Sequence, residues 1–316
     1  MGTLTIKGTI DMAQFWPSGH SDADTVKVSL AGIKTPFRFK ADGAKEIKTT
    51  VFDTAVVRSK FGQTPVVEKG SVDVRLQGID APELHYKPQN YRQHHAESAT
   101  VALGALLAKS GRSAVPCRVI TRVEEPNDVC DMYARIVGDV VVRLGMKYVN
   151  LNEWLAAQGW AFPAFYTSMS PGEITRLTKL SESARKARKN IWRAGAYTAQ
   201  IGPFDGTLRM RKKGSQIASE TGPVIWPKFF RRLVEWKLVK TGAEPTLKAH
   251  LGGGGGERFV PTDELLEHSL TAAEQQRLAD SLDANDAMTL APKDYVIVEK
   301  PATLYAADGK TKISAW

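Results

Sequence analysis

The chain has 316 residues and a formal net charge of +9 at pH 7, with 43 Lys and Arg against 34 Asp and Glu. This length accommodates one or two domains, and no segment approaches the ~20 consecutive apolar residues that a membrane-spanning helix needs. A basic protein of this kind often binds polyanions, but many basic proteins do not, so the charge alone identifies no partner.

The N-terminal residues alternate between apolar and polar side chains, which predicts a first strand over residues 4–10 and a second over residues 24–30. Residues 31–71 contain the alternating run Phe37-Arg38-Phe39-Lys40 and an Ala-Asp-Gly turn at 41–43, and we interpret them as a long β-arm. The cations and rings of this arm suit a nucleic-acid backbone and its bases. The alternative, which we favour, is a strand that buries its Phe side and keeps its cations in water.

The most informative segment is residues 75–83, Arg-Leu-Gln-Gly-Ile-Asp-Ala-Pro-Glu. It places Arg75, Asp80 and Glu83 around the end of an apolar strand over 72–79 and the turn that Pro82 forces. The aspartates Asp22 and Asp24 lie at the turn before the second strand, and Arg135 lies at the start of the strand over 134–143. Aspartates that bind a hard cation, a glutamate that acts as a base and guanidinium groups that bind phosphate suit phosphodiester hydrolysis.

Apolar spacing beyond this segment predicts helices over residues 96–109, 150–158 and 173–190 and strands over 115–122 and 134–143. Five strands with a helix between the third and the fourth predict an α+β fold, a five-stranded OB-type β-barrel with about three helices. The two cysteines, Cys117 and Cys130, could form a cross-strand disulfide, but we favour two buried thiols. No Cys/His spacing indicates zinc.

The order of these motifs resembles the staphylococcal nuclease (thermonuclease) family. The motifs are Asp-x-Asp-Thr at 22–25, Arg-x-x-x-x-Asp-x-Pro-Glu at 75–83, Tyr-x-Arg at 133–135 and a last helix followed by Asn-Ile-Trp at 190–192. The likeness covers residues 4–193, and it marks 31–71 as an insertion because family members have a short hairpin there. We therefore predict a nuclease-like domain at 1–200 and a small mixed accessory region at 201–316, with a glycine linker at 252–256.

The resemblance implies a calcium-dependent enzyme that hydrolyses DNA or RNA by attack of water on the phosphodiester. The implied Ca²⁺ ligands are all oxygen donors, namely Asp24, Asp80 and the main-chain carbonyl of Ala81. The implied catalytic residues are one base and two phosphate-binding cations, namely Glu83, Arg75 and Arg135. The implied substrate contacts are aromatic, namely Tyr133, Phe165 and Tyr166. Two positions depart from the family pattern: Ala23 replaces the usual Gly, and Ala81 replaces a frequent Thr.

The C-terminal region matches no family that we recognise. Residues 204–250 are basic, and their aromatic residues interleave with cations, a pattern that suits a single-strand groove. The alternative, which we favour, is an amphipathic helix over 228–240 that buries its apolar face. Residues 262–283 are acidic and helical in pattern, and a strand over 294–300 is expected to pair with 303–305 or 312–315.

Two function classes remain open from the sequence. One is the nuclease; the other is a non-catalytic nucleic-acid-binding or scaffold module built on the same barrel, as some proteins of this type are. The complete set of two aspartates, one glutamate and two arginines favours the enzyme. We expect a monomer that acts on nucleic acid and binds no membrane. We also expect a cytoplasmic location for the chain as given, or secretion if a leader has been removed.

Overall fold

A computed structural model describes residues 1–31, 37–50, 52–59, 62–201, 208–216, 222–239, 244–253, 256–267, 275–300 and 302–316. These residues fall into two compact units that are interleaved along the chain. The barrel unit comprises Met1–Gln77, Ala102–Trp154 and Lys300–Trp316. The second unit comprises Gly78–Val101 and Leu155–Glu299.

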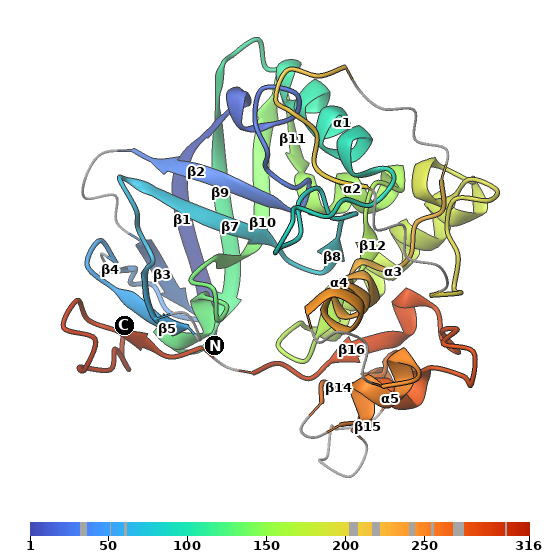
Figure 1. Cartoon of the computed structure of the whole chain (residues 1–316). Coiled ribbons are helices and arrows are strands. Elements are labelled where there is room, and N and C mark those ends of the chain that lie inside the picture. Colours follow the sequence, from blue (N-terminus) through green and yellow to red (C-terminus); the bar gives the residue numbers. More distant parts are fainter. Residues whose placement is uncertain are drawn as a thin grey trace. The chain divides into compact units, whose positions relative to one another are not determined.

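Five strands of the barrel unit close into a barrel, which confirms the predicted OB-type α+β fold (Figure 1). They are β1 (Gly2–Asp11), β2 (Thr25–Leu30), β7 (Ser71–Leu76), β10 (Ile136–Leu144) and β9 (Ala114–Val123). β1 pairs with β2, β2 with β7, β10 with β9 and β9 with β1, all antiparallel. The parallel pairing of β7 with β10 completes the circuit, so that each of the five strands has a partner on both edges.

Alternation along each strand fills the barrel with aliphatic side chains. In β7 the residues Val72, Val74 and Leu76 are buried, so the intervening Arg75 lies on the opposite face of the strand. The buried Asn152 fixes the helix that follows the barrel: it accepts from the Val140 amide at 3.1 Å and donates to the carbonyl of Gln77 at 2.9 Å. The barrel interior includes Leu4, Ile6, Ile10, Val26, Val28, Val119, Ile136, Val140 and Val142.

The three predicted helices are present as α1 (Ala96–Ala108), α2 (Leu151–Gln158) and α3 (Pro171–Lys186). α3 begins two residues earlier than predicted because Ser170 and Glu173 form a capping box and Pro171 occupies the first turn. None of the helices in the described ranges is long and apolar enough to cross a membrane. Short helical turns lie at η1 (Met12–Gln14), η2 (Pro126–Val129), η3 (Asn190–Trp192), η6 (Leu278–Ser281) and η7 (Pro292–Asp294).

The insertion folds as strands β3 (Phe37–Ala41), β4 (Lys48–Thr50), β5 (Val56–Ser59) and β6 (Gly62–Pro65). β3 pairs with both β1 and β4. Phe37 and Phe39 are buried while Arg38 and Lys40 are exposed, which confirms the interpretation that the Phe side packs inward. The last residues of the chain belong to this unit as well, since Phe39 stacks on Trp316 at 4.3 Å between ring centroids.

β17 (Leu304–Tyr305) pairs with β5 of the insertion. The strand expected over 294–300 is β16 (Tyr295–Ile297), and it pairs with β13 (Phe165–Tyr166) and β14 (Arg258–Pro261). The prediction that it pairs with 303–305 or 312–315 was therefore wrong. The strand instead belongs to the core of the second unit, where Tyr295 and Ile297 are buried in one cluster with Phe259. The remaining strands are β8 (Ile79–Asp80), β11 (Lys147–Asn150), β12 (Phe162–Pro163) and β15 (Gln276–Arg277).

The segment predicted as an amphipathic helix forms α4 (Pro227–Val234) and a π-helical turn, η4 (Glu235–Val239). Its apolar side chains are buried as expected, namely Phe229, Phe230, Leu233, Val234 and Trp236. The acidic segment begins with α6 (Thr262–Glu267), whereas residues 268–274 lie outside the described ranges. In the predicted glycine linker, Gly252 is the last residue of α5 (Leu247–Gly252), and residues 254–255 lie outside the described ranges.

The core of the second unit contains residues from both sides of position 200. Phe162 and Trp192 belong to the same buried cluster as Trp226, Phe259 and Tyr295. The Trp226 and Tyr295 rings lie 4.9 Å apart, and those of Phe162 and Trp192 lie 5.1 Å apart. The boundary between 1–200 and 201–316 stays a prediction, and this packing means that truncation there would expose a large apolar surface.

Both cysteines are unbonded and buried. Burial raises the pKa of the Cys117 thiol to about 12 and raises that of Cys130 as well. Thiols with such pKa values are protonated at neutral pH and unreactive.

A partly buried charge network connects α4 to the residue that precedes β14 (Arg258–Pro261). Glu257 accepts from Lys228 Nζ at 2.8 Å and from Arg232 Nε at 2.9 Å. Burial alone would raise the pKa of Glu257, but the two cations lower it from 4.5 to about 2. Because the pKa in the folded state is the lower one, this carboxylate stabilises the fold above pH 4.5 and loses that contribution as the pH falls toward 2.

We expect Glu257→Gln to lower the free energy of unfolding at pH 7 by roughly 1–3 kcal/mol, because two partly buried cations lose their partner. The loss should shrink as the pH falls below 4.5. Urea unfolding at several pH values measures it. Glu267→Gln, at an exposed position of α6, is the matched control and should change stability by less than about 0.5 kcal/mol.

Candidate active site

Asp24, Thr25 and Arg75 lie together in the barrel unit. Thr25 and Arg75 are register partners on β2 and β7, so their side chains share one face of the sheet. Arg75 forms an ion pair with Asp24 through Nη1, and the Thr25 hydroxyl donates to Asp24 Oδ1 at 3.3 Å. Asp24 is buried and Arg75 nearly so, which makes this pair much less screened than a surface ion pair. Ala23 does not have a positive φ, so replacing glycine there introduces no left-handed strain.

Arg135 joins the same cluster from the start of β10. Its Nη1 donates to the Thr25 hydroxyl at 3.3 Å, and its Nε donates to Asp131 Oδ2 at 2.8 Å. Asp131 also accepts from the amides of Tyr133 and Arg135 at 2.9 and 3.0 Å, which closes a tight turn through Ala134 at φ 65°. Tyr133 projects from this turn, 47% exposed, with Arg135 5.5 Å from its ring centroid.

In the second unit, Asp80 and Glu83 share one cation, the guanidinium of Arg231 on α4. Arg231 donates from Nη2 to Asp80 Oδ2 at 2.9 Å and from Nη1 to Asp80 Oδ1 at 3.2 Å, and Nη1 also pairs with Glu83 Oε1. The Asp80 side chain is 1% exposed. Burial alone would lower the pKa of Arg231, but Asp80 and Glu83 raise it well above its ordinary value.

The loop that carries Glu83 is held by Gln93. The Glu83 amide donates to Gln93 Oε1 at 3.1 Å, and the Gln93 amide donates to the Glu83 carbonyl at 2.8 Å. Gln93 Nε2 in turn donates to the carbonyl of Ile225 at 2.9 Å, two residues before α4 begins. Asp80 is held by the pairing of β8 with β12, where its register partner is Phe162. The same contacts therefore position the two carboxylates and the helix that supplies their cation.

Three further predicted residues lie in the second unit. Ala81 is buried directly after β8. Phe165 is completely buried, so its ring has no exposed face, and the substrate contact expected of it stays a prediction. Its backbone pairs with Val296, which places the ring in the core. The neighbouring Tyr166 is partly exposed, and Lys228 Nζ lies 5.8 Å from its ring centroid.

A hard cation such as Ca²⁺ requires several oxygen ligands around one position. Among the described residues, no group of three or more His, Cys, Asp and Glu side chains is arranged to hold a metal ion. Asp80 and Glu83 nevertheless converge on one positive group, the Arg231 guanidinium, which stands where a cation is electrostatically favoured. Their donors are carboxylate oxygens, the kind that Ca²⁺ prefers, and such an ion completes its shell with carbonyls, water and phosphate. The donor chemistry therefore fits calcium.

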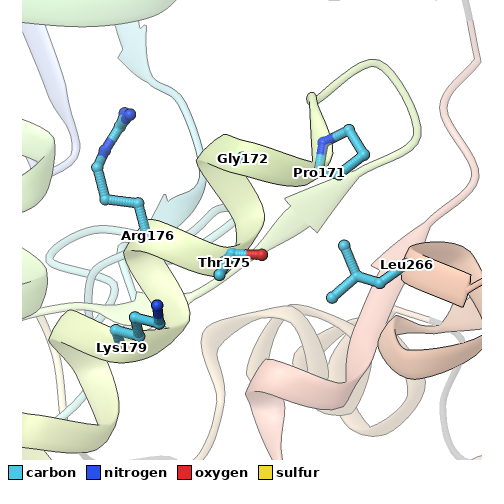
Figure 2. A pocket seen from close by; sticks show the side chains of 6 residues that line it. All are labelled: Pro171, Gly172, Thr175, Arg176, Lys179 and Leu266. Carbon is cyan, nitrogen blue, oxygen red and sulfur yellow. The ribbon is translucent and has the colours of Figure 1, made fainter.

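The second unit also has an open hollow of about 510 Å³ on the first two turns of α3 (Figure 2). Its lining consists of Pro171, Gly172, Thr175, Arg176, Lys179 and Leu266. It contains none of the predicted site residues.

Residues 73–194 match the family described as staphylococcal nuclease homologue, and we conclude that this segment belongs to that family. All the site residues that the sequence predicts, except Asp24, lie within the matched segment. No curated protein matches the chain closely enough for comparison.

Sequence analysis missed two residues of the site. Asp131 received no role, although a carboxylate four residues before an arginine is a usable signal for an ion pair. Arg231 lies 151 residues from Asp80 in the chain, and its segment showed only that cations alternate with aromatic residues. No local pattern could have assigned it to these carboxylates.

We expect Gly78→Ala to destabilise the protein by about 2–4 kcal/mol, combining left-handed strain with overpacking. Gly78 precedes β8 at φ +77°, and an added Cβ would overlap Leu177 Cδ1 and lie 2.7 Å from Met169 Cε. Thermal or urea unfolding measures the effect.

The matched control is Gly195→Ala, at φ +78° with no atom within 4 Å of the added Cβ. Gly195→Ala introduces the left-handed backbone strain without the steric overlap, and it should lower the free energy of unfolding by about 1 kcal/mol. Equal losses for the two variants would show that the packing around Gly78 does not constrain β8.

Proposed function

We propose that the protein is a calcium-dependent phosphodiesterase that hydrolyses DNA or RNA. The observation that carries the proposal is the convergence of Asp80 and Glu83, inside a nuclease-family segment, on one cation position. The two carboxylates are exposed to solvent to different extents, which suits them to different chemical roles. The nearly inaccessible Asp80 is suited to bind a cation, and Glu83, with 13% of its side chain exposed, to exchange a proton.

The expected ligands of the ion are Asp24, Asp80 and the carbonyl oxygen of Ala81. When bound, Ca²⁺ supplies Lewis acidity toward a phosphoryl oxygen and neutralises the charge that develops there. Carboxylate and carbonyl oxygens, without His or Cys, favour calcium over zinc.

Each remaining residue has a role that its chemistry supports. Glu83 accepts a proton from the attacking water, because a carboxylate within reach of water is a competent general base. Arg75 and Arg135 donate to phosphate oxygens as rigid two-pronged donors, and these bonds strengthen as negative charge accumulates. The exposed ring of Tyr133 and the partly exposed ring of Tyr166 contact the nucleotide.

A basic face of the barrel unit supports a polyanionic substrate. Arg38 and Lys40 of β3 and Lys7 of β1 surround a hollow of about 290 Å³ together with Arg118 of β9. Thr5 is opposite Arg38 and Lys7 is opposite Arg118 in the strand register, so the cations occupy neighbouring positions on three adjacent strands. Among the described residues none of the four forms an ion pair, whereas Lys27 pairs with Asp73 and Arg122 with Asp42.

The same face favours the second candidate function, a nucleic-acid-binding module without catalysis. Four unpaired cations on a sheet bind phosphates whether or not a reaction follows. The two functions differ in one property. A nuclease cleaves the phosphodiester bond and needs Glu83 to do so, whereas a binding module does not cleave it.

We expect Glu83→Gln to lower turnover on a short oligonucleotide by about 10² or more, since the amide cannot accept a proton, while the Kd changes little. Initial rates at saturating substrate and a fluorescence-anisotropy titration in chelator separate the two quantities. Glu267→Gln serves as the control. Turnover within a few fold of the wild type would contradict the assignment of Glu83 as the base.

We expect Arg38→Gln combined with Lys40→Gln to weaken binding to long nucleic acid and to reduce the slope of log Kd against log salt by about 1–2. The control is Lys27→Gln combined with Arg122→Gln, which removes the same charge from cations that already have carboxylate partners. Titrations in EDTA prevent cleavage. Equal slope changes for both pairs would show that net charge alone, and not this face, binds the phosphates.

A further inference from the structure

The carboxylates assigned above to metal binding and water activation are already neutralised by the chain itself. The guanidinium of Arg231 donates to both oxygens of Asp80 and pairs with Glu83. Both carboxylate oxygens of Asp80, which a metal ion would need as ligands, are therefore already hydrogen-bonded to the guanidinium. A divalent ion and a guanidinium at this place would repel each other strongly, because the surroundings are largely desolvated.

We propose that Arg231 is an internal competitor of the divalent cation for Asp80 and Glu83. This inference rests on the proposed function, and it adds that the C-terminal helix α4 sets the affinity of the site for its metal. In the absence of the ion, Arg231 compensates the buried negative charge. When the ion binds, the guanidinium withdraws from Asp80, and its cationic head becomes available to a phosphate oxygen.

The packing of α4 allows Arg231 to move without the helix. The helix is anchored by the buried side chains Phe229 and Leu233 and by the contacts of Lys228 and Arg232 with Glu257. None of these contacts involves Arg231. Its side chain is 23% exposed, which gives the guanidinium a route to solvent. Exchange therefore needs only a rotamer change on a fixed helix.

The neighbouring Arg232 provides a matched comparison. It carries the same charge on the same helix, but its partners are Glu257 and Glu235 and not the candidate catalytic carboxylates. A long-range charge effect would make the two arginines equivalent for metal binding. Direct competition would make only Arg231 important.

The experiment is a calorimetric titration of nucleic-acid-free, full-length protein with Ca²⁺, for the wild type, Arg231→Gln and Arg232→Gln. We expect Arg231→Gln to bind Ca²⁺ roughly tenfold more tightly or better, and Arg232→Gln to stay within about threefold of the wild type. Thermal unfolding gives a second readout: Ca²⁺ should raise the Tm of Arg231→Gln more than that of the wild type.

Removal of Arg231 leaves a buried carboxylate without its partner and could prevent folding in the absence of metal. Arg231→Lys retains the charge with a single point of attachment and should have an intermediate Ca²⁺ affinity. Unchanged or weaker Ca²⁺ binding by both Arg231 variants, beside measurable binding by the wild type, would overturn the competition and leave the proposed function standing. Absence of Ca²⁺ binding in every variant, including the wild type, would overturn both.

Discussion

A carboxylate that is almost completely removed from water needs a positive partner, and Asp80 is such a carboxylate. Leaving it unpaired would cost several kcal/mol, a large part of the stability of an ordinary domain. In the second unit this requirement is met by Arg231, which comes from a helix far along the chain. The position of that helix depends in turn on the aromatic core that contains Trp226 and Phe229 and on the cations that surround Glu257. Fold stability and the charge state of the candidate site are therefore linked.

In the barrel unit the buried carboxylate of Asp24 is also neutralised, but by different residues. Strand alternation places Arg75 and Thr25 on one face, at matching positions of β7 and β2, and Asp24 and Arg135 complete the cluster. Every charged group there has an opposite charge or a hydroxyl within hydrogen-bonding distance. Guanidinium groups held in this way are oriented before a phosphate arrives, which reduces the entropy that binding would otherwise cost.

Much of the barrel could be predicted because its strands follow from patterns within short segments of the sequence. The five strands follow from period-two alternation, and the short motif from Arg75 to Glu83 contains one cation and two carboxylates within nine residues of sequence. The burial of Phe165 could not be predicted, because it depends on Val296, a strand partner 131 residues away in the chain. Arg231 was missed because its contact with Asp80 also joins residues that are far apart in the chain. The stacking of Trp316 on Phe39 likewise joins segments that are far apart in the chain, and no periodicity encodes it.

The most direct test of the account is cleavage itself. Plasmid DNA and total RNA are incubated with the purified full-length protein in Ca²⁺, in Mg²⁺ and in excess EDTA, and the products are separated by electrophoresis. The account predicts degradation in Ca²⁺ that the chelator abolishes and that returns when Ca²⁺ is restored. Full activity in EDTA would contradict the proposed metal chemistry, and intact nucleic acid under all three conditions would favour the non-catalytic binding module.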